Sequence, residues 1–151
     1  MNLDQIKLGM VLSQFNQPIT ERLAKGAWQR LAELGITAEQ VIYFEVPGAV
    51  EIPLMAKLIA EQRLCNAIVC LGAVIRGETN HYDYVCSQVS DGCQRVALDH
   101  GVPVIFGVLT TDNEEQALAR TGGDQGHKGR EAVDCAIMML QNLQKLSTYL
   151  V

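Results

Sequence analysis

The chain has 151 residues, of which 48% are hydrophobic and 19% are charged, and its formal net charge is -5 at pH 7. This balance is typical of one globular domain, residues 1–151, and excludes a wholly disordered chain. The chain has no run of Lys or Arg, and no apolar run reaches the roughly 20 residues of a membrane helix, so we expect neither nucleic-acid nor membrane partners. No secretory signal pattern opens the sequence, and we expect a cytoplasmic protein.

The cysteines argue for a reduced, metal-free protein. There are five, an odd number, and no C-x-x-C pair occurs among them: Cys65, Cys70, Cys86, Cys93 and Cys135. This pattern favours free thiols over a disulfide framework, and its spacing is not that of a zinc site. We therefore expect neither disulfides nor a metal.

Four short apolar runs are candidate strands. They occupy residues 8–13, 41–46, 67–71 and 104–109, and each is apolar on both faces. Such runs are typical of strands that are covered on both sides, as in a parallel sheet.

The first amphipathic stretch predicts a helix between the first two strands. Apolar residues recur at steps of four, four and three from Leu23 to Leu34. Pro18 suits the start of this helix and Gly35 the position just past its end.

Four more helices are predicted along the chain. One carries apolar residues at 52, 55, 56 and 59 and must begin near Val50, because Pro53 is tolerated only in a first turn. A long helix with an apolar stripe over residues 85–100 closes at Gly101. Residues 111–114 form a capping box that opens a short helix, and the last helix spans about residues 129–146.

The resulting order β-α-β-α-β-α-β-α-α predicts an α/β fold. We expect a three-layer sandwich, flavodoxin-like, with a four-stranded parallel sheet and helices on both faces. In such folds ligands bind beyond the carboxyl ends of the strands. The segments of interest are then residues 14–18, 47–51, 72–81 and 110–112.

The first two of these segments offer an aromatic ring and a carboxylate. Phe15 follows a predicted strand, where it either folds back onto a helix or presents a flat surface to a planar ligand. Glu51 falls in a first helical turn, where the helix dipole favours a carboxylate and where it could also accept hydrogen bonds from sugar hydroxyls.

The third segment places a histidine beside a possible anion site. Thr79 and Asn80 can cap the long helix, and the free N–H groups of its first turn can bind an anion. His81 lies in that turn, where it is either structural or a group for proton transfer near neutral pH.

Two basic residues, Arg120 and Lys128, flank a glycine-rich loop that follows the fourth segment. Arg120 ends the short helix, where the dipole alone favours a cation, and Lys128 closes the loop of residues 121–129. The loop is not a P-loop, and no G-x-G-x-x-G motif occurs in the chain. Arg120 and Lys128 could instead bind a phosphate together.

These motifs, in this order and spacing, resemble a known family. The segments that carry the resemblance are residues 15–16, 46–53 (VPGAVEIP), 72–85 (GAVIRGETNHYDYV), 103–111 (PVIFGVLTT), 116–117, and Arg120 through 126–129 (GHKG). Together they make the chain similar to the 6,7-dimethyl-8-ribityllumazine synthase family of riboflavin biosynthesis, over about residues 7–143.

The resemblance implies a reaction. Members of this family join 5-amino-6-(D-ribitylamino)uracil to 3,4-dihydroxy-2-butanone 4-phosphate without cofactor or metal. An amine attacks the ketone to form an imine, phosphate leaves, and the second amine closes the ring on the carbonyl. Positioning and proton transfer do most of this work.

The resemblance also implies roles for particular residues. His81 would be the proton donor. Phe15 would stack on the pyrimidine, Ala49, Val50 and Glu51 would hold the ribityl chain, Ala73, Val74 and Ile75 would line the uracil pocket, and Glu78 and Thr79 would offer backbone donors to the phosphate. Phe106 would complete the aromatic wall, and Arg120 with Lys128 would bind the phosphate.

The last three of these residues come from a neighbouring subunit in the family. The resemblance therefore implies a homo-oligomer, at least a pentamer, and allows a larger shell that encloses riboflavin synthase. Two alternatives remain open at this point: a flavodoxin-like protein that binds a flavin or another phosphorylated ligand without turnover, and a shell protein whose main role is to enclose a partner.

Overall fold

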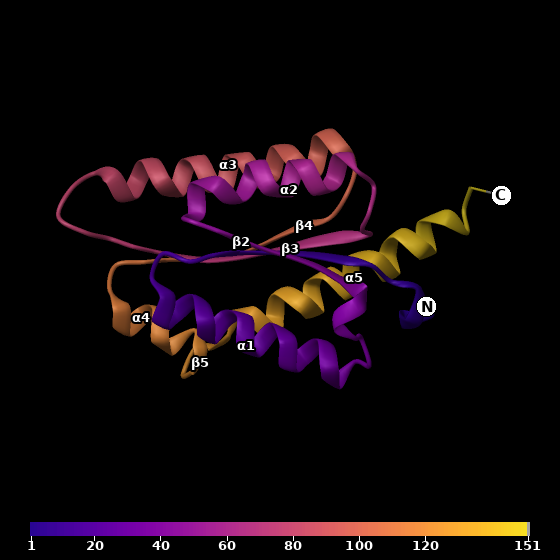
Figure 1. The fold of residues 1–151 in the computed structure, drawn as a ribbon, viewed down its shortest axis with the longest axis horizontal. Coiled ribbons are helices and arrows are strands. Elements are labelled where there is room, and N and C mark those ends of the chain that lie inside the picture. The colour runs from indigo at the N-terminus through magenta and orange to yellow at the C-terminus, as the bar shows by residue number, and fades with distance from the viewer. Residues whose placement is uncertain (151) are drawn as a thin grey trace.

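A parallel sheet lies between two layers of helices in the computed structural model, which describes residues 1–150 (Figure 1). The strands are β1 (Leu8–Ser13), β2 (Val41–Val46), β3 (Ala67–Ile75) and β4 (Val104–Thr111). They are ordered β2-β1-β3-β4, and each neighbouring pair is parallel. This order starts in the middle of the sheet and reverses direction once, as in doubly wound flavodoxin-like folds. The predicted fold class is confirmed.

The two helical layers bury opposite faces of the sheet. Helices α1 (Gln17–Glu33), α4 (Glu114–Ala119) and α5 (Lys128–Ser147) cover one face, and α2 (Ile52–Glu61) and α3 (His81–His100) cover the other (Figure 1). On β3 the side chains alternate between the two cores, with Val69 on the α1 side and Ile68 and Cys70 on the α2 side. This alternation explains why the run is apolar without interruption.

The helices begin and end close to the predicted residues. Pro18 lies in the first turn of α1, and Gly35 follows the C-cap of that helix with φ of +77°. A 3-10 turn, Ala49–Glu51, leads into α2, so that Pro53 falls in the first turn of α2. Further 3-10 turns occur at Leu3–Gln5 and Ala38–Gln40.

The strands differ from the prediction in length and in exposure. β3 continues to Ile75 instead of residue 71, and β4 to Thr111 instead of residue 109, because these two strands keep pairing after β1 has ended. β2 was expected to be covered on both faces, but Tyr43, Phe44 and Glu45 are exposed, because β2 is an edge strand. A run of apolar letters cannot distinguish an edge strand from a central one.

Two helix caps and one hairpin also differ. The N-cap of α4 is Asn113, whose side chain accepts a hydrogen bond from the Gln116 N–H at 2.8 Å, so the expected capping box at residue 111 is wrong by two residues. The Asn80 side chain does not cap α3. The glycine-rich loop contains a short antiparallel pair, β5 (Thr121–Gly123) and β6 (Gly126–His127), which the sequence pattern did not predict.

The cysteines form no disulfide, and the possible metal ligands form no cluster, in the described part of the chain. All five cysteines are free thiols. In residues 1–150, no three His, Cys, Asp or Glu side chains gather into a cluster that could hold a metal ion. No helix of that part of the chain is both long and apolar enough to cross a bilayer.

Candidate active site

A pocket of about 480 Å³ opens at the carboxyl ends of β1, β2 and β3. This volume suits a drug-sized ligand. Its walls are mainly apolar, with a few polar groups among them. The lining residues named by the resemblance are Phe15, Ala49, Val50, Glu51, Ala73, Val74, Ile75, Thr79 and His81. Three of the four segments expected at this edge of the sheet therefore meet in one place.

Phe15 stands at the mouth of this pocket as an exposed ring. Its side chain is 71% exposed, so the alternative in which it folds back onto a helix is wrong. The backbone around it is tied to the end of β2, because the Gln14 N–H donates to the Val46 carbonyl at 2.9 Å and the Phe15 N–H donates to the Pro47 carbonyl at 3.0 Å. The ring is thus available for stacking without a large cost in backbone ordering.

Asn16 organises the turn that carries Phe15, a role that sequence reasoning missed. It adopts a left-handed conformation, with φ of 63° and ψ of 48°, and its Nδ2 donates to the Ala73 carbonyl at 2.8 Å. Asn is among the few residues other than Gly that tolerate this conformation. The residue type is a signal of such a turn, but its partner on β3 is known only from the fold.

Glu51 combines a local role with a place on the pocket wall. Its Oε2 accepts a hydrogen bond from the Gly48 N–H at 3.0 Å, which closes the turn before α2. Oε2 therefore serves the helix start, as one of the two sequence alternatives proposed. The residue is nevertheless exposed and lines the pocket, which leaves Oε1 able to accept hydrogen bonds from a ligand.

His81 is the first residue of α3 and also lines the pocket. Its backbone N–H donates to the Thr79 hydroxyl at 3.3 Å, and its imidazole is exposed. Thr79 also lines the pocket, whereas Glu78 is exposed and does not. The turn between β3 and α3 thus presents an imidazole and a hydroxyl at the start of a helix, a place where an anion can bind and a proton can be transferred.

Arg76 holds that turn to the rest of the fold, a second role that sequence reasoning missed. Its Nε donates to Asp112 at 3.0 Å, Nη1 lies 3.5 Å from Asp83, and the guanidinium stacks 4.2 Å from the centre of the Tyr82 ring. Burial is the main reason that the pKa of Tyr82 is raised, so its phenol stays protonated at neutral pH. The turn before His81 is therefore tied to the end of β4.

The remaining predicted residues lie in a second depression of about 430 Å³. Phe106, Arg120 and Lys128 line it together with residues of β4 and α5, and none of its lining residues also lines the first pocket. Arg120 is half-buried, and its Nη1 donates to the Gln116 carbonyl at the end of α4 at 2.9 Å. A single chain thus divides the predicted site between two places, with nine residues in the first pocket and three in the second depression, while Glu78 lines neither.

The fold and the first pocket together define a class of protein. It is a flavodoxin-like α/β protein with an aromatic ring, a carboxylate and an imidazole around one small-molecule pocket at the carboxyl ends of its parallel strands.

Comparison with known proteins identifies the family. A model of the 6,7-dimethyl-8-ribityllumazine synthase family matches residues 5–144. A 6,7-dimethyl-8-ribityllumazine synthase of Coxiella burnetii (strain CbuG_Q212) is 55% identical over 146 residues, which cover 97% of each chain. One from Protochlamydia amoebophila (strain UWE25) is 46% identical over 147 residues, 97% of this chain and 86% of that protein. The chain therefore belongs to the 6,7-dimethyl-8-ribityllumazine synthase family.

Proposed function

We propose that this chain catalyses the condensation of 5-amino-6-(D-ribitylamino)uracil with 3,4-dihydroxy-2-butanone 4-phosphate, which yields 6,7-dimethyl-8-ribityllumazine, phosphate and water. The observation that carries the proposal is the pocket in which Phe15, Glu51 and His81 converge, in a chain of this family. A flat ring needs an apolar or aromatic wall, a polyhydroxy chain needs hydrogen-bonding groups, and a phosphate needs N–H donors and cations. This pocket meets the first two needs, but no Lys or Arg among residues 1–150 lines it.

The pyrimidine and its ribityl chain account for the first pocket. Phe15 stacks on the ring, and Ala73, Val74 and Ile75 form the apolar floor beneath it. Ala49, Val50 and Glu51 accommodate the ribityl chain, whose hydroxyls donate to the Glu51 carboxylate. Ala49 is buried and Val50 is 36% exposed, so these two small side chains leave space for the ribityl chain on their side of the pocket.

His81 is the proton donor and acceptor of the reaction. Attack of an amine on the C2 ketone releases water and leaves an imine. Loss of the proton from the adjacent C3 then expels phosphate from C4. These steps move protons at nitrogen, at oxygen and at C3, which an exposed imidazole at the pocket wall can accept or donate. The backbone N–H groups of Glu78 and Thr79 hold the phosphate at the start of α3.

The phosphate also needs the cations of the second depression, which implies an oligomer. Phe106, Arg120 and Lys128 complete the first pocket of a neighbouring subunit, and a ring of like subunits satisfies every site in the same way. We propose a ring of five subunits. A larger shell around riboflavin synthase is the corresponding proposal at the next level of assembly. The five free thiols fit a reducing compartment such as the cytoplasm.

The experiment that tests the function mixes the purified protein with both substrates and follows the visible absorbance of the lumazine product. We expect product well above the uncatalysed rate, and none when either substrate is omitted. Tight flavin binding without any acceleration would contradict the proposal and favour the binding-protein alternative.

A further inference from the structure

The β5–β6 hairpin joins the two cations of the second depression. Arg120 directly precedes β5 and Lys128 directly follows β6, and the Lys128 N–H donates to the Arg120 carbonyl at 2.8 Å. One residue further in, Thr121 pairs with His127. The relative position of the two cations therefore depends on how this hairpin is held.

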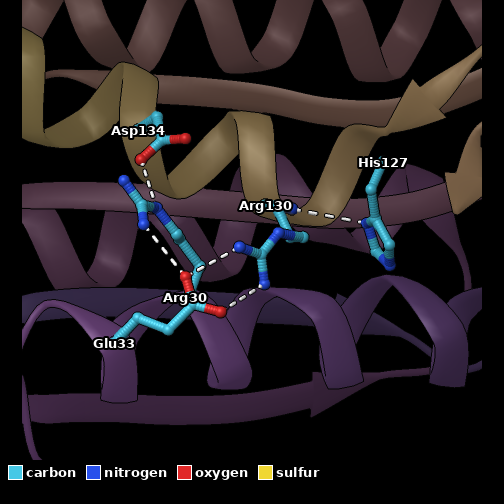
Figure 2. A network of polar contacts seen from close by, with 5 residues as sticks. All are labelled: Arg30, Glu33, His127, Arg130 and Asp134. Carbon is cyan, nitrogen blue, oxygen red and sulfur yellow. Dashed lines mark hydrogen bonds and ion pairs between the residues drawn. The ribbon is translucent and has the colours of Figure 1, made fainter.

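The His127 side chain attaches the hairpin to helix α1. Its ring lies over Gly26, where any Cβ would overlap the imidazole, and a Cβ on Gly122 of β5 would be 3.5 Å from the ring. The ring thus fills a recess that exists only because α1 carries a glycine at this point. Figure 2 shows His127 at the start of α5, beside the ion-pair network that links α5 to α1.

The same imidazole caps helix α5. His127 is the N-cap residue, and its Nδ1 accepts a hydrogen bond from the Arg130 N–H at 3.4 Å (Figure 2). An acceptor at Nδ1 requires an imidazole without a proton on that nitrogen, so the proton of the neutral ring is on Nε2.

The surroundings of His127 favour this neutral form. Burial is the largest cause of its lowered pKa, and the positive charge of Arg130 acts in the same direction. The backbone carbonyl of His127 itself, the Arg22 carbonyl and the Glu131 carboxylate act in the opposite direction and raise the pKa.

We propose that His127 is a positioning residue for the phosphate-binding cations, because its neutral imidazole anchors the β5–β6 hairpin on α1 and caps α5 where Lys128 begins. This inference rests on the proposed function. Protonation would turn Nδ1 into a donor that faces a second donor, the Arg130 N–H. The hydrogen bond that caps α5 would then be lost, and the first turn of α5 would be less stable. Arg120 and Lys128 would then hold the phosphate less well, while the distant pyrimidine pocket would stay intact.

The first test compares three variants by steady-state kinetics at neutral pH. His127→Ala should raise KM for the butanone phosphate about tenfold, the loss expected when a charge-assisted contact is misplaced, and leave KM for the pyrimidine within about twofold. His127→Asn should recover most of this loss, because Asn is a good N-cap residue. Glu33→Gln removes the ion pair between Glu33 on α1 and Arg130 on α5 and should change neither KM.

Gly26→Ala tests the anchor from the other helix. Its methyl group should displace the ring and raise the same KM. In that background, His127→Asn should improve KM instead of worsening it, because the shorter side chain leaves room for the methyl group. Such a reversal of sign is a direct measure of contact between two positions. Additive effects of the two substitutions would overturn the anchoring role.

The second test is the pH profile, which a purely structural residue would not alter. The substrate phosphate itself gains a proton near pH 6, so KM rises on acidification in every variant. Because the pKa of His127 is lowered from its ordinary value of 6.5, the ring becomes protonated only below that pH. As the pH falls below 6.5, the rise in KM should therefore be steeper for the wild type than for His127→Asn, which has no titrating group at this position. Parallel profiles, or an equal loss for both substrates in His127→Ala, would overturn the inference. An inactive wild type would overturn the proposed function, whereas an active wild type with unchanged variants would overturn only the role of His127.

Discussion

Individual side chains in the pocket serve the fold and the ligand at once. Glu51 closes a turn with one carboxylate oxygen, and its other oxygen is available to a ligand in the pocket. Asn16 has a left-handed backbone conformation, and its side chain donates a hydrogen bond to β3. The residue types alone allowed both a structural and a functional interpretation. The hydrogen bonds show that the structural interpretation is correct for Glu51, and the exposure of its carboxylate shows that it does not exclude the functional one.

The first prediction for a single residue concerns His81. His81→Ala should lower kcat by about 10²-fold or less, within the range of general acid–base catalysis, and flatten the pH profile of kcat. The decrease can be small, because the two substrates also condense without a catalyst. His100→Gln, at the other end of the same helix, is the matched control and should leave kcat unchanged. If kcat and its pH profile are both unchanged in His81→Ala, His81 takes no part in the chemistry.

Arg120 carries the second prediction at the residue scale. One nitrogen of its guanidinium already binds the Gln116 carbonyl, and the others can bind a phosphate. Arg120→Ala should raise KM for the butanone phosphate by about tenfold or more, because one charge-assisted hydrogen bond contributes about 1.5–3 kcal/mol. KM for the pyrimidine should change little.

The control for Arg120 is a cation outside both depressions. Arg95→Ala, on the exposed surface of α3, removes the same charge and should leave both KM values unchanged. Equal losses for both substrates in Arg120→Ala would show that the substitution disturbs folding or assembly instead of phosphate binding.

Among the elements, α1 and α5 are joined by charge as well as by apolar packing. Glu33 on α1 accepts two hydrogen bonds from Arg130 on α5, at 2.9 and 2.7 Å, and Arg30 pairs with Asp134 at 2.7 Å (Figure 2). The Arg130 guanidinium, followed by that of Arg30, lowers the pKa of Glu33 to about 2. These contacts hold together the two helices between which His127 lies.

The pH dependence of stability tests this ion-pair network. A carboxylate with a lowered pKa stabilises the fold above its ordinary pKa of 4.5, and the contribution is lost as the pH falls toward 2. The wild type should therefore unfold at a higher temperature than Glu33→Gln at pH 6, by a small margin, because the pair is partly exposed. The difference between the two melting temperatures should be smaller at pH 3 and should vanish near pH 2. A margin that is the same at pH 6 and pH 3 would show that the charge of Glu33 contributes nothing.

For the whole molecule, the main consequence is that one chain holds two separate parts of the predicted site. If neighbouring subunits complete each other, the protein should run as at least five times the mass of one chain by light scattering, and dilution to monomers should abolish activity. A monomer with full activity would contradict the shared site.

Complementation is a sharper test of the same arrangement. His81→Ala and Arg120→Ala proteins, each weak alone, should regain activity when they are unfolded, mixed and refolded together. Some interfaces would then combine an intact His81 from one chain with an intact Arg120 from the next. Activity no higher than the average of the two variants would place both residues in the site of a single chain.

The sequence by itself determined the layers of the fold. Strands that are buried on both faces need continuous apolar runs, and helices that are buried on one face need a period near 3.6, so these patterns follow from local geometry. β1 and α5 appear within about one residue of the prediction for this reason. The aromatic ring, the carboxylate and the imidazole could be placed at one edge of the sheet because parallel strands end together.

Only the tertiary structure decided what depends on distant neighbours. The exposure of β2 depends on its place at the edge of the sheet, and the length of β3 depends on how far β4 runs beside it. The division between the pocket and the cations of Arg120 and Lys128 follows from the path of the chain past β4 into a hairpin. That hairpin rests on α1 through His127 and Gly26, about 100 residues apart in sequence, a contact that no local pattern encodes.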